Sequence, residues 1–210
     1  MAEGKAVRLR GACTDSDCFS VNFAGDSECN ECAFYFNLRP NQGTVVRNAH
    51  YGGWGEEERD IDEFPFNPGQ YFDATFIATT NGYLVFLNDT YFTTFNHHTS
   101  IGDAKYLVLK ADVSIADVQY YEPMEDDFVK RIPSGLMKGD IVLFRGYFKR
   151  DANGFSVYLM NGYDTESDVA FVFNPRRNEA EVVMNNRIDG QWLEEERKEI
   201  LYAFVDSPPI

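Results

Sequence analysis

The chain is poor in basic residues, and this shortage excludes two classes of partner. It holds 19 Lys and Arg against 34 Asp and Glu among 210 residues, which gives a formal net charge of −15. Nucleic-acid binding draws much of its affinity from Lys and Arg side chains that neutralise phosphates. Anionic membrane surfaces attract proteins through the same side chains. We therefore expect no nucleic acid and no membrane among the partners, whereas neutral ligands fit this charge.

Long apolar runs are also missing. Residues 1–10 lack the apolar centre of a signal peptide, and no run is long and apolar enough to span a membrane. We therefore expect synthesis in the cytosol and a cytoplasmic location. The alternative is export to the extracellular space by a route that needs no signal peptide.

Cysteine is scarce and confined to one end of the chain. The four cysteines are Cys13, Cys18, Cys29 and Cys32. Their spacing suggests a zinc knuckle, but a later repeat of the same segment, described below, contains no cysteine. A fold that forms without them does not need a metal at this place. We therefore expect reduced surface thiols, with no metal and no other cofactor.

One polar stretch organises the rest of the chain. Its amide, guanidinium, indole and carboxylate side chains are Asn37, Arg39, Asn48, Trp54, Glu57 and Arg59. The stretch has no nucleophile and no obvious acid–base pair, but it suits a polyol. An indole can stack on the C–H face of a sugar ring, while the polar groups bond adjacent hydroxyls. The stretch predicts a site that binds a sugar without reacting with it.

The same stretch recurs about 137 residues later. Its second copy contains Asn174, Arg176, Asn185, Trp192, Glu195 and Arg197. A period of this length indicates a duplicated domain, because solenoid repeats are far shorter. The sequence predicts a first domain over residues 1–122, a linker over 123–130 and a truncated second domain over 131–210. The second copy diverges after residue 197.

Short strands separated by turn signals predict an all-β fold, an antiparallel β-sandwich. The strands expected in the first domain are Ala6–Arg10, Phe19–Phe23, Ala33–Leu38, Thr44–Asn48, Tyr71–Ala78, Tyr83–Leu87, Tyr91–Phe95, Tyr106–Lys110 and Val113–Val118. Those expected in the second are Ile141–Tyr147, Phe155–Met160, Val169–Phe173 and Glu181–Asn185. A short helix is expected over Glu194–Phe204.

With these motifs in place, the chain resembles the galectin family. The family signature reads His-Phe-Asn-Pro-Arg, Val-x-Asn and Trp-Gly-x-Glu-x-Arg on three consecutive strands. Here the first copy reads Tyr35-Phe-Asn37-Leu-Arg39, Val46-Arg-Asn48 and Trp54-Gly-Glu-Glu57-Glu-Arg59. The resemblance covers nearly all of residues 4–120 and 131–197. It implies a galectin-like jelly roll and a non-catalytic lectin whose partners are β-galactoside-containing glycans or glycoproteins.

The resemblance also implies a role for each site residue. Asn37 and Arg39 are expected to hold the axial 4-hydroxyl of galactose, whose ring stacks on Trp54. Asn48 and Glu57 are expected to hold the 6-hydroxyl. Arg39 with Glu57 would reach the neighbouring sugar, and Arg59 would orient Glu57. The six residues of the second copy would act in the same way.

Two departures from the signature point to an alternative function. The family histidine is replaced by Tyr35 in the first copy and by Val172 in the second. Losing one sugar hydrogen bond costs about 1–3 kcal/mol when a partner is left unpaired, or roughly tenfold to a hundredfold in affinity. The alternative is a galectin-like interaction or structural module with lost or altered sugar binding.

A glycoside hydrolase is the third class and the least favoured. Such enzymes need two carboxylates facing each other across the scissile bond. Glu57, flanked by Arg39 and Arg59, would stay ionised and be unfit as an acid. We therefore expect no enzymatic activity.

The second copy has no counterpart of residues 64–118, which amounts to about half a sandwich. An unclosed half-sandwich exposes strand edges and an apolar face. The sequence thus predicts a fragment or alternative transcript of a two-domain galectin. It also predicts self-association through the incomplete second domain.

Overall fold

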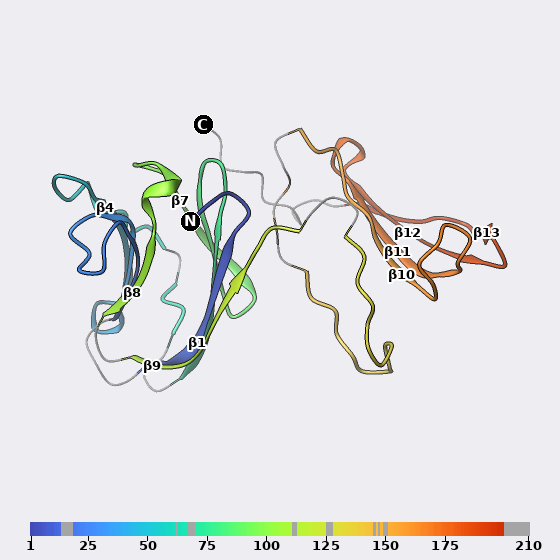
Figure 1. Ribbon diagram of the computed structural model, residues 1–210, viewed down its shortest axis with the longest axis horizontal. Coiled ribbons are helices and arrows are strands. Elements are labelled where there is room, and N and C mark those ends of the chain that lie inside the picture. Colours follow the sequence, from blue (N-terminus) through green and yellow to red (C-terminus); the bar gives the residue numbers. More distant parts are fainter. Residues whose placement is uncertain are drawn as a thin grey trace. The chain divides into compact units, whose positions relative to one another are not determined.

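The computed structural model describes residues 1–13, 19–61, 63–66, 70–110, 113–124, 128–144, 146, 148 and 151–199. The chain forms two compact units, Met1–Glu125 and Asp126–Ile210, here called unit 1 and unit 2. Every strand pairing described is antiparallel, and the helices of the described part are three 3-10 turns, Pro40–Gln42, Ile101–Asp103 and Arg177–Glu179 (Figure 1). The predicted all-β fold class is confirmed.

Unit 1 contains two sheets. The four-stranded sheet has the order β4-β3-β2-β8, with bounds Thr44–His50, Cys32–Arg39, Phe19–Ala24 and Tyr106–Lys110. The five-stranded sheet has the order β7-β6-β5-β1-β9, with bounds Thr90–Asn96, Gly82–Leu87, Tyr71–Ala78, Ala6–Cys13 and Val113–Tyr121. Figure 1 shows β4 and β8 on one side of unit 1 and β1 and β9 on the other.

Along β3 of the four-stranded sheet, successive side chains face the core and the outer face of the sheet in turn. On β3, Phe34 and Phe36 are fully buried, and both contact Phe76 of the other sheet at ring-centroid distances of 6.2 and 5.3 Å. Successive side chains of a strand point to opposite faces. Tyr35 and Asn37 therefore lie on the face of β3 that points away from this aromatic core. The two sheets form a sandwich around the core, and the outer face of the four-stranded sheet is left for a site.

The turn between β5 and β6 needs a glycine because the backbone of β7 passes very close to it. A Cβ placed on Gly82 would lie 2.2 Å from the carbonyl oxygen of Phe95 on β7. The Thr79 amide donates to the Gly82 carbonyl at 2.8 Å, which closes the turn. The hairpin predicted at Asn81-Gly82 thus forms, with β6 beginning at Gly82 itself.

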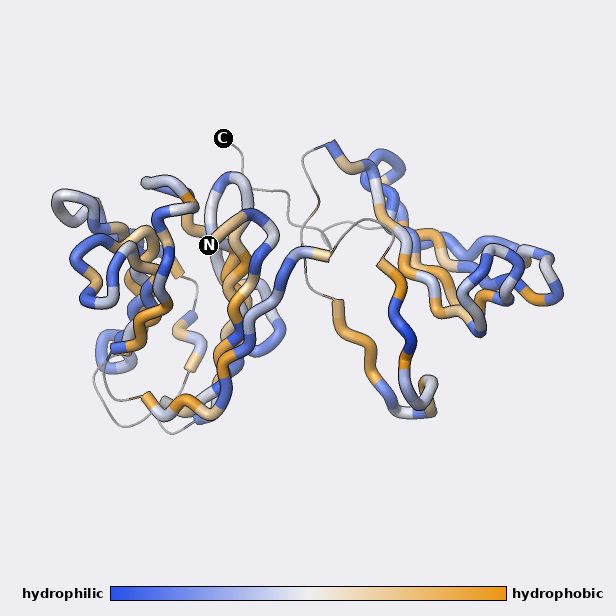
Figure 2. Tube along the Cα trace, viewed as in Figure 1, coloured by the Kyte–Doolittle hydropathy of each residue, from blue (hydrophilic) through white to orange (hydrophobic). Residues whose placement is uncertain are grey.

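Unit 2 contains one five-stranded sheet within its described residues. The order is β10-β11-β12-β13, and β14 also pairs with β12. The bounds are Val157–Met160, Val169–Arg176, Glu181–Ile188, Gln191–Trp192 and Glu196–Glu199. The apolar residues follow the strands of each unit (Figure 2). In unit 2 many of them are exposed, including Phe171 on β11 and Ile141, which is 88% exposed.

Two local predictions for unit 2 are wrong. The strand expected over Ile141–Tyr147 is absent from residues 141–144 and 146, while residues 145 and 147 lie outside the described residues. The helix expected over Glu194–Phe204 is also wrong where the chain is described, because Glu196–Glu199 forms strand β14. Pairing with β12 satisfies the backbone groups of this segment, whereas a short isolated helix is marginal. Residues 200–204 lie outside the described residues.

Within the described part of the chain, none of the helices has the length and hydrophobicity needed to cross a membrane.

Candidate functional site

Strand register gathers the predicted site residues of unit 1 onto one face of the four-stranded sheet. Tyr35 on β3 lies opposite Asn48 on β4, and Asn37 lies opposite Val46. A further bridge joins Arg47 to Glu58, with two backbone hydrogen bonds of 2.9 Å. Since Arg47 lies opposite Phe36 on the core side, Glu58 also faces that side. Its neighbours Glu57 and Arg59 therefore face the same way as Asn37.

Four of these side chains form a continuous polar network. The Nε of Arg39 donates to Oδ1 of Asn37 at 2.6 Å, and its Nη2 lies 3.5 Å from Oε1 of Glu57. On the other side, the Nε of Arg59 donates to Oε2 of Glu57 at 2.8 Å. The hydrogen bond from Arg59 and the charges of both arginines hold the pKa of the Glu57 carboxyl below its usual value. The network is thus an ionised carboxylate between two guanidiniums, anchored at one end to an amide.

Asn48 supports the loop that carries the tryptophan. This side chain is buried, and its Nδ2 donates to the Gly55 carbonyl at 3.0 Å while its Oδ1 accepts from the Ala49 amide at 2.8 Å. An amide side chain has two donor hydrogens and an oxygen with two lone pairs, so these bonds leave capacity for a ligand. The position of Asn48 therefore suits both positioning the loop and contacting a bound hydroxyl.

Trp54 is the exposed apolar surface of the site. Its side chain is 56% exposed and lies between Tyr35 and His50. Both neighbouring rings meet the indole edge-on, with centroid distances of 5.0 Å for Tyr35 and 4.9 Å for His50. The His50 ring is itself held through Nδ1, which lies 2.6 Å from the carbonyl oxygen of Asn30. Edge-on neighbours fix the indole and leave a ring face available for stacking.

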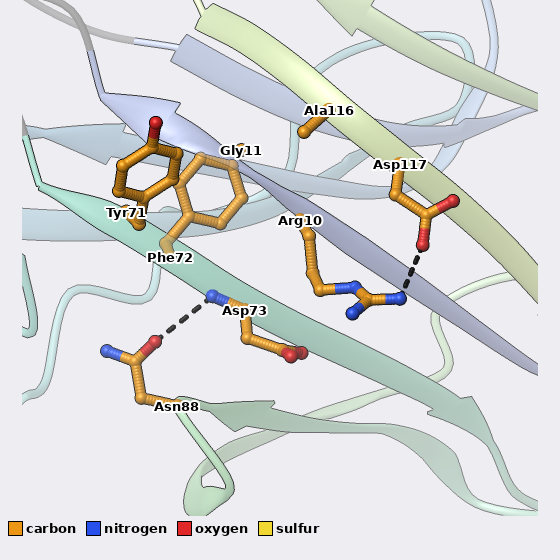
Figure 3. A pocket seen from close by; sticks show the side chains of 8 residues that line it. All are labelled: Arg10, Gly11, Tyr71, Phe72, Asp73, Asn88, Ala116 and Asp117. Atoms are coloured by element: carbon orange, nitrogen blue, oxygen red, sulfur yellow. Dashed lines mark hydrogen bonds and ion pairs between the residues drawn. The ribbon is translucent and has the colours of Figure 1, made fainter.

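Among the hollows formed by the described residues of unit 1, one adjoins this network. It has a volume of about 550 Å³ and is lined by residues that include Asn48, Tyr51, Glu57 and His98. Another, of about 600 Å³, lies on the five-stranded sheet (Figure 3). Its charged residues are engaged in pairs, since Arg10 lies 2.6 Å from Asp117 and Asp73 accepts from Arg8 at 2.8 Å. The hollow beside the network is the better ligand candidate because Asn48 and Glu57 of the predicted motif line it.

Unit 2 repeats the network on its own sheet. Arg176 donates to Asn174 at 2.7 Å and its Nη2 lies 3.7 Å from Oε1 of Glu195, to which Arg197 donates through Nε at 3.0 Å. Asn185 donates to the Leu193 carbonyl at 3.1 Å, as Asn48 does to Gly55. Trp192 is 49% exposed. The same atoms thus make the same contacts twice in one chain.

The second site also differs from the first. Val172 takes the place of Tyr35 opposite Asn185 and is buried, so it offers the site no polar group. Trp192 lies beside a cation, with the Arg187 guanidinium carbon 5.5 Å from its ring centroid. Two more acids surround Arg197, because Glu179 and Glu181 lie 3.2 and 2.9 Å from its Nη1. More of the charge of this arginine is therefore neutralised than that of Arg59.

The family model of galactoside-binding lectins matches residues 1–120 and 127–208. The chain belongs to this family.

Among curated proteins, bovine galectin-4 is 26% identical over 245 residues, covering 93% of this chain and 73% of the relative. The 32 kDa beta-galactoside-binding lectin of Caenorhabditis elegans is 26% identical over 203 residues, covering 93% of this chain and 70% of the relative. The structure of sheep galectin-11 in complex with glycerol matches with a TM-score of 0.53 and 25% identity. That match covers 58% of this chain and 92% of the sheep chain. The predicted resemblance to galectins is confirmed.

The lectin has polar residues beside the site that sequence reasoning missed. On β2, Ser20 lies opposite Asn37, and Asn22 lies opposite Tyr35. Both are buried, and Asn22 donates to Ser20 at 3.0 Å and to the Val108 carbonyl at 2.8 Å. The Oδ1 of Asn22 is buried without a hydrogen-bond partner in the described part. The alternation of polar and apolar residues over Phe19–Phe23 was the available signal.

Arg47 is a third residue that the lectin motif does not predict. Its side chain is 1% exposed, and it forms ion pairs with Asp60 and with Glu58, the latter at 3.5 Å. It also donates to the Asp60 backbone carbonyl at 3.1 Å. A buried guanidinium of this kind ties the segment that carries Glu57 and Arg59 to β4.

The expectation of surface thiols is wrong for one cysteine. Cys29 is half-buried, but Cys32 at the start of β3 is 2% exposed. Cys18 lies outside the described residues. Within the described residues, no group of three or more His, Cys, Asp or Glu side chains is arranged to hold a metal ion.

Proposed function

We propose that this chain is a non-catalytic lectin that binds β-galactoside-containing glycans at the polar face of unit 1. The observation that carries the proposal is the network of Asn37, Arg39, Glu57 and Arg59 beside the exposed indole of Trp54. Membership of the galactoside-binding lectin family supports the class of ligand. The curated relatives support it in the same way, since one of them is named a beta-galactoside-binding lectin.

The chemistry of galactose fits this arrangement. Its axial 4-hydroxyl leaves one ring face free for stacking on Trp54, while Asn37 and Arg39 supply an amide and a guanidinium for that hydroxyl. Asn48 and Glu57 supply an amide and a carboxylate for the 6-hydroxyl. Because Arg39 is already bonded to Asn37 and close to Glu57, little conformational entropy remains to be lost when a sugar binds.

The ionisation of Glu57 supports binding without catalysis. Two guanidiniums keep the pKa of this carboxyl low, so it accepts hydrogen bonds rather than donating a proton. A glycosidase acid needs the opposite shift, with its carboxyl kept protonated near neutral pH. Wild-type protein is expected to leave an aryl β-galactoside uncleaved. Turnover that disappears in Glu57→Gln would contradict the proposal.

The direct test is retention on an immobilised lactosyl column, followed by elution with free lactose. Wild-type protein is expected to be retained and eluted specifically. Trp54→Ala should weaken retention, with Trp192→Ala as its matched variant in unit 2. Flow-through of wild-type protein whose circular dichroism shows folded β-structure would rule out simple lactose binding.

The second candidate is a galectin-like module whose sugar binding is lost or altered. The observation that favours it is the edge-on contact of Tyr35 with Trp54, which places a large ring where the family has a histidine. A glycan array distinguishes the two functions. Binding to galactose-containing glycans other than lactose would indicate altered specificity, and no binding to any glycan would favour an interaction module.

Self-association through unit 2 stays a prediction from the sequence. The exposure of Phe171 and Ile141 supports it, since exposed apolar residues favour association. Sedimentation velocity over a range of concentrations tests it. A monomer at all concentrations would contradict it.

A further inference from the structure

The stacking tryptophan of each unit follows a turn with left-handed backbone. In unit 1, Trp54 comes after Gly52, whose φ is 64°. In unit 2, Trp192 comes after Asp189 and Gly190, whose φ values are 52° and 73°. Glycine enlarges the set of conformations that such a segment can adopt. An indole that is already held in place loses less conformational entropy when a sugar stacks on it, so the contacts that hold it bear on affinity.

In unit 1 the indole is held by His50, its partner in an antiparallel bridge. The two rings meet edge-on with a centroid distance of 4.9 Å. The same imidazole contacts the loop between β2 and β3, where its Nδ1 lies 2.6 Å from the carbonyl oxygen of Asn30. A carbonyl oxygen can only accept, so Nδ1 carries the hydrogen and donates it. His50 thus joins the indole to the β2–β3 loop.

In unit 2 Arg187 makes the same two contacts with a different side chain. It pairs with Trp192 across β12 and β13, and its guanidinium carbon lies over the indole, 5.5 Å from the ring centroid. Its Nη2 donates to the carbonyl oxygen of Ser167 in the loop between β10 and β11. Arg187 lies 137 positions after His50, and Ser167 lies 137 positions after Asn30, which is the period of the duplication. The tether is therefore repeated at equivalent positions.

An aspartate orders the loop that supplies each accepting carbonyl. In unit 1, Oδ1 of Asp26 accepts from the Asn30 amide at 3.2 Å. In unit 2, Oδ1 of Asp164 accepts from the Ser167 hydroxyl at 2.7 Å. Aspartate side chains that bond groups a few residues ahead fix the backbone of a turn. The residue that anchors the tryptophan is thus itself held in both units.

We propose that His50 and Arg187 are positioning residues of the two sugar sites, each of which ties the stacking tryptophan to a carbonyl that an aspartate holds. The consequence for sugar affinity rests on the proposed function, but the hold on the indole does not. Histidine and arginine share a planar head group with N–H donors, which contacts an indole on one side and donates on the other. Both tethers use these shared features.

The two tryptophans depend on their tethers to different degrees. Trp54 has a second ring neighbour, Tyr35, at 5.0 Å. In unit 2 the buried Val172 takes that place. Among the residues that the structure describes, Arg187 is the one side chain with a ring or cation contact to Trp192. Removing Arg187 is therefore expected to disturb its tryptophan more than removing His50 disturbs Trp54.

The test uses the full chain in two backgrounds, Trp192→Phe and Trp54→Phe, so that fluorescence reports one tryptophan at a time. In the first background, His50→Ala should increase acrylamide quenching of Trp54 and weaken lactose binding by roughly threefold to tenfold, measured by fluorescence titration. His50→Arg should restore both, because arginine makes the same two contacts in unit 2.

The second background gives the reciprocal experiment. Arg187→Ala should increase the quenching of Trp192, and by a larger factor than His50→Ala gives for Trp54. Arg187→His should restore the low quenching, because an imidazole makes the same two contacts in unit 1.

The loop aspartate tests whether the contacts act in series. Asp26→Ala should increase the quenching of Trp54, but it should add nothing to His50→Ala, since both remove one tether. Glu31→Ala is the matched control. Glu31 is an exposed acid of the same loop, and its side chain makes no hydrogen bond or ion pair with the described residues. This variant should leave the quenching unchanged.

The proposal is overturned if His50→Ala, shown by circular dichroism to be folded, has the same quenching as its background, or if His50→Arg does not restore it. Independent, multiplying effects of Asp26→Ala and His50→Ala would also overturn it. If quenching changes while lactose affinity does not, the tryptophan is held without a gain in binding and the positioning role fails. If wild-type protein does not bind lactose while quenching responds as expected, the proposed function fails and the hold on the indole stands.

Discussion

Arg39 and Asn37 lie two residues apart on β3, and the guanidinium Nε donates a 2.6 Å hydrogen bond to the amide oxygen. Residues at this spacing share one face of a strand, so the bond forms without distorting the backbone. It orients the guanidinium so that Nη2 points towards Glu57 at 3.5 Å. The geometry of the site thus depends on a side chain that is bonded at both ends.

Replacing this arginine by lysine is expected to weaken lactose binding at least tenfold. A lysine ammonium is a point charge and cannot reproduce the planar contacts with both Asn37 and Glu57. The matched control is Arg10→Lys on the five-stranded sheet, where the arginine pairs with Asp117 and not with the site. Calorimetric titration of both variants provides the comparison. An unchanged affinity in Arg39→Lys would show that the network does not contact the sugar.

Tyr35→His is expected to strengthen lactose binding by roughly tenfold. The smaller ring removes bulk beside Trp54, and an imidazole nitrogen offers a hydrogen-bond partner worth about 1 kcal/mol or more. Tyr35→Phe is the control for the hydroxyl group, because it keeps the ring. Binding of both variants is measured on the lactosyl column and by calorimetry. A histidine variant that binds more weakly than wild type would show that Tyr35 itself contributes to recognition.

Lactose binding is expected to persist at mildly acidic pH. The pKa of Glu57 lies below its ordinary value of 4.5, so the carboxylate is ionised above that range and becomes protonated only as pH falls through the lowered pKa. As far as this group is concerned, affinity at mildly acidic pH should therefore equal affinity at neutral pH, and it should fall only at pH values below the ordinary carboxyl pKa. Glu57→Gln should bind weakly throughout and show no acid-dependent loss. A midpoint above the ordinary carboxyl range would contradict the assignment.

Asp60→Ala is expected to destabilise unit 1. The Arg47 side chain is 1% exposed, and Asp60 supplies one of its two ion-pairing carboxylates. Removing a partner of a buried charge costs about 3–5 kcal/mol when nothing replaces it. Glu58 remains at 3.5 Å and the Asp60 carboxylate is itself 89% exposed, so about 1–2 kcal/mol is expected here. Urea unfolding measures the loss, with the exposed Glu63→Ala as control. Equal midpoints for the two variants would refute the expectation.

Ala180→Gly is expected to stabilise unit 2 by up to about 1 kcal/mol. Ala180 ends the 3-10 turn after β11 with φ 52°, where the same turn of unit 1 ends in Gly43 with φ 57°. The left-handed conformation costs an L-residue about 1–2 kcal/mol, and the extra freedom of glycine in the unfolded chain offsets part of the gain. Gly43→Ala is the reverse substitution at the equivalent position and should destabilise unit 1. Thermal unfolding of both variants tests whether Ala180→Gly stabilises the protein and Gly43→Ala destabilises it.

Strand alternation explains which parts of the fold could be predicted from the sequence. Tyr71–Ala78 was predicted with the bounds that the structure shows, because small and aromatic residues alternate cleanly along it. The apolar run at Ile141 gave a similar local signal but forms no strand among residues 141–144. A strand requires a partner, and the local pattern does not say whether one exists. In the same way, the pairing of Glu196–Glu199 with β12 overrode a weak helical period.

The grouping of the motif residues on one face is the part of the candidate site that local spacing predicts. Its motif residues come together because β3, β4 and the segment bridged to β4 at Glu58 carry them, and their shared face follows from the alternation of side chains along these segments. Asn22 and the coupling of His50 to Asn30 could not be found in this way, because they depend on contacts between segments distant in sequence. The alternation of Val46, Arg47 and Asn48 did contain a usable signal, since it places an arginine on the core side where acidic partners are required.

In unit 1 the polar network joins β3 to the segment of Glu57 and Arg59, which bridges β4, and in unit 2 it joins β11 to Glu195 and to Arg197 on β14. No residue of the five-stranded sheet of unit 1 takes part in its described bonds. The polar network and the aromatic core of the sandwich are therefore formed by separate sets of residues. Substitutions in the core-facing positions of β5 and β6 can alter the stability of the fold without altering the side chains of the network. Selection can act on the two properties independently, which is how one scaffold can supply many receptors.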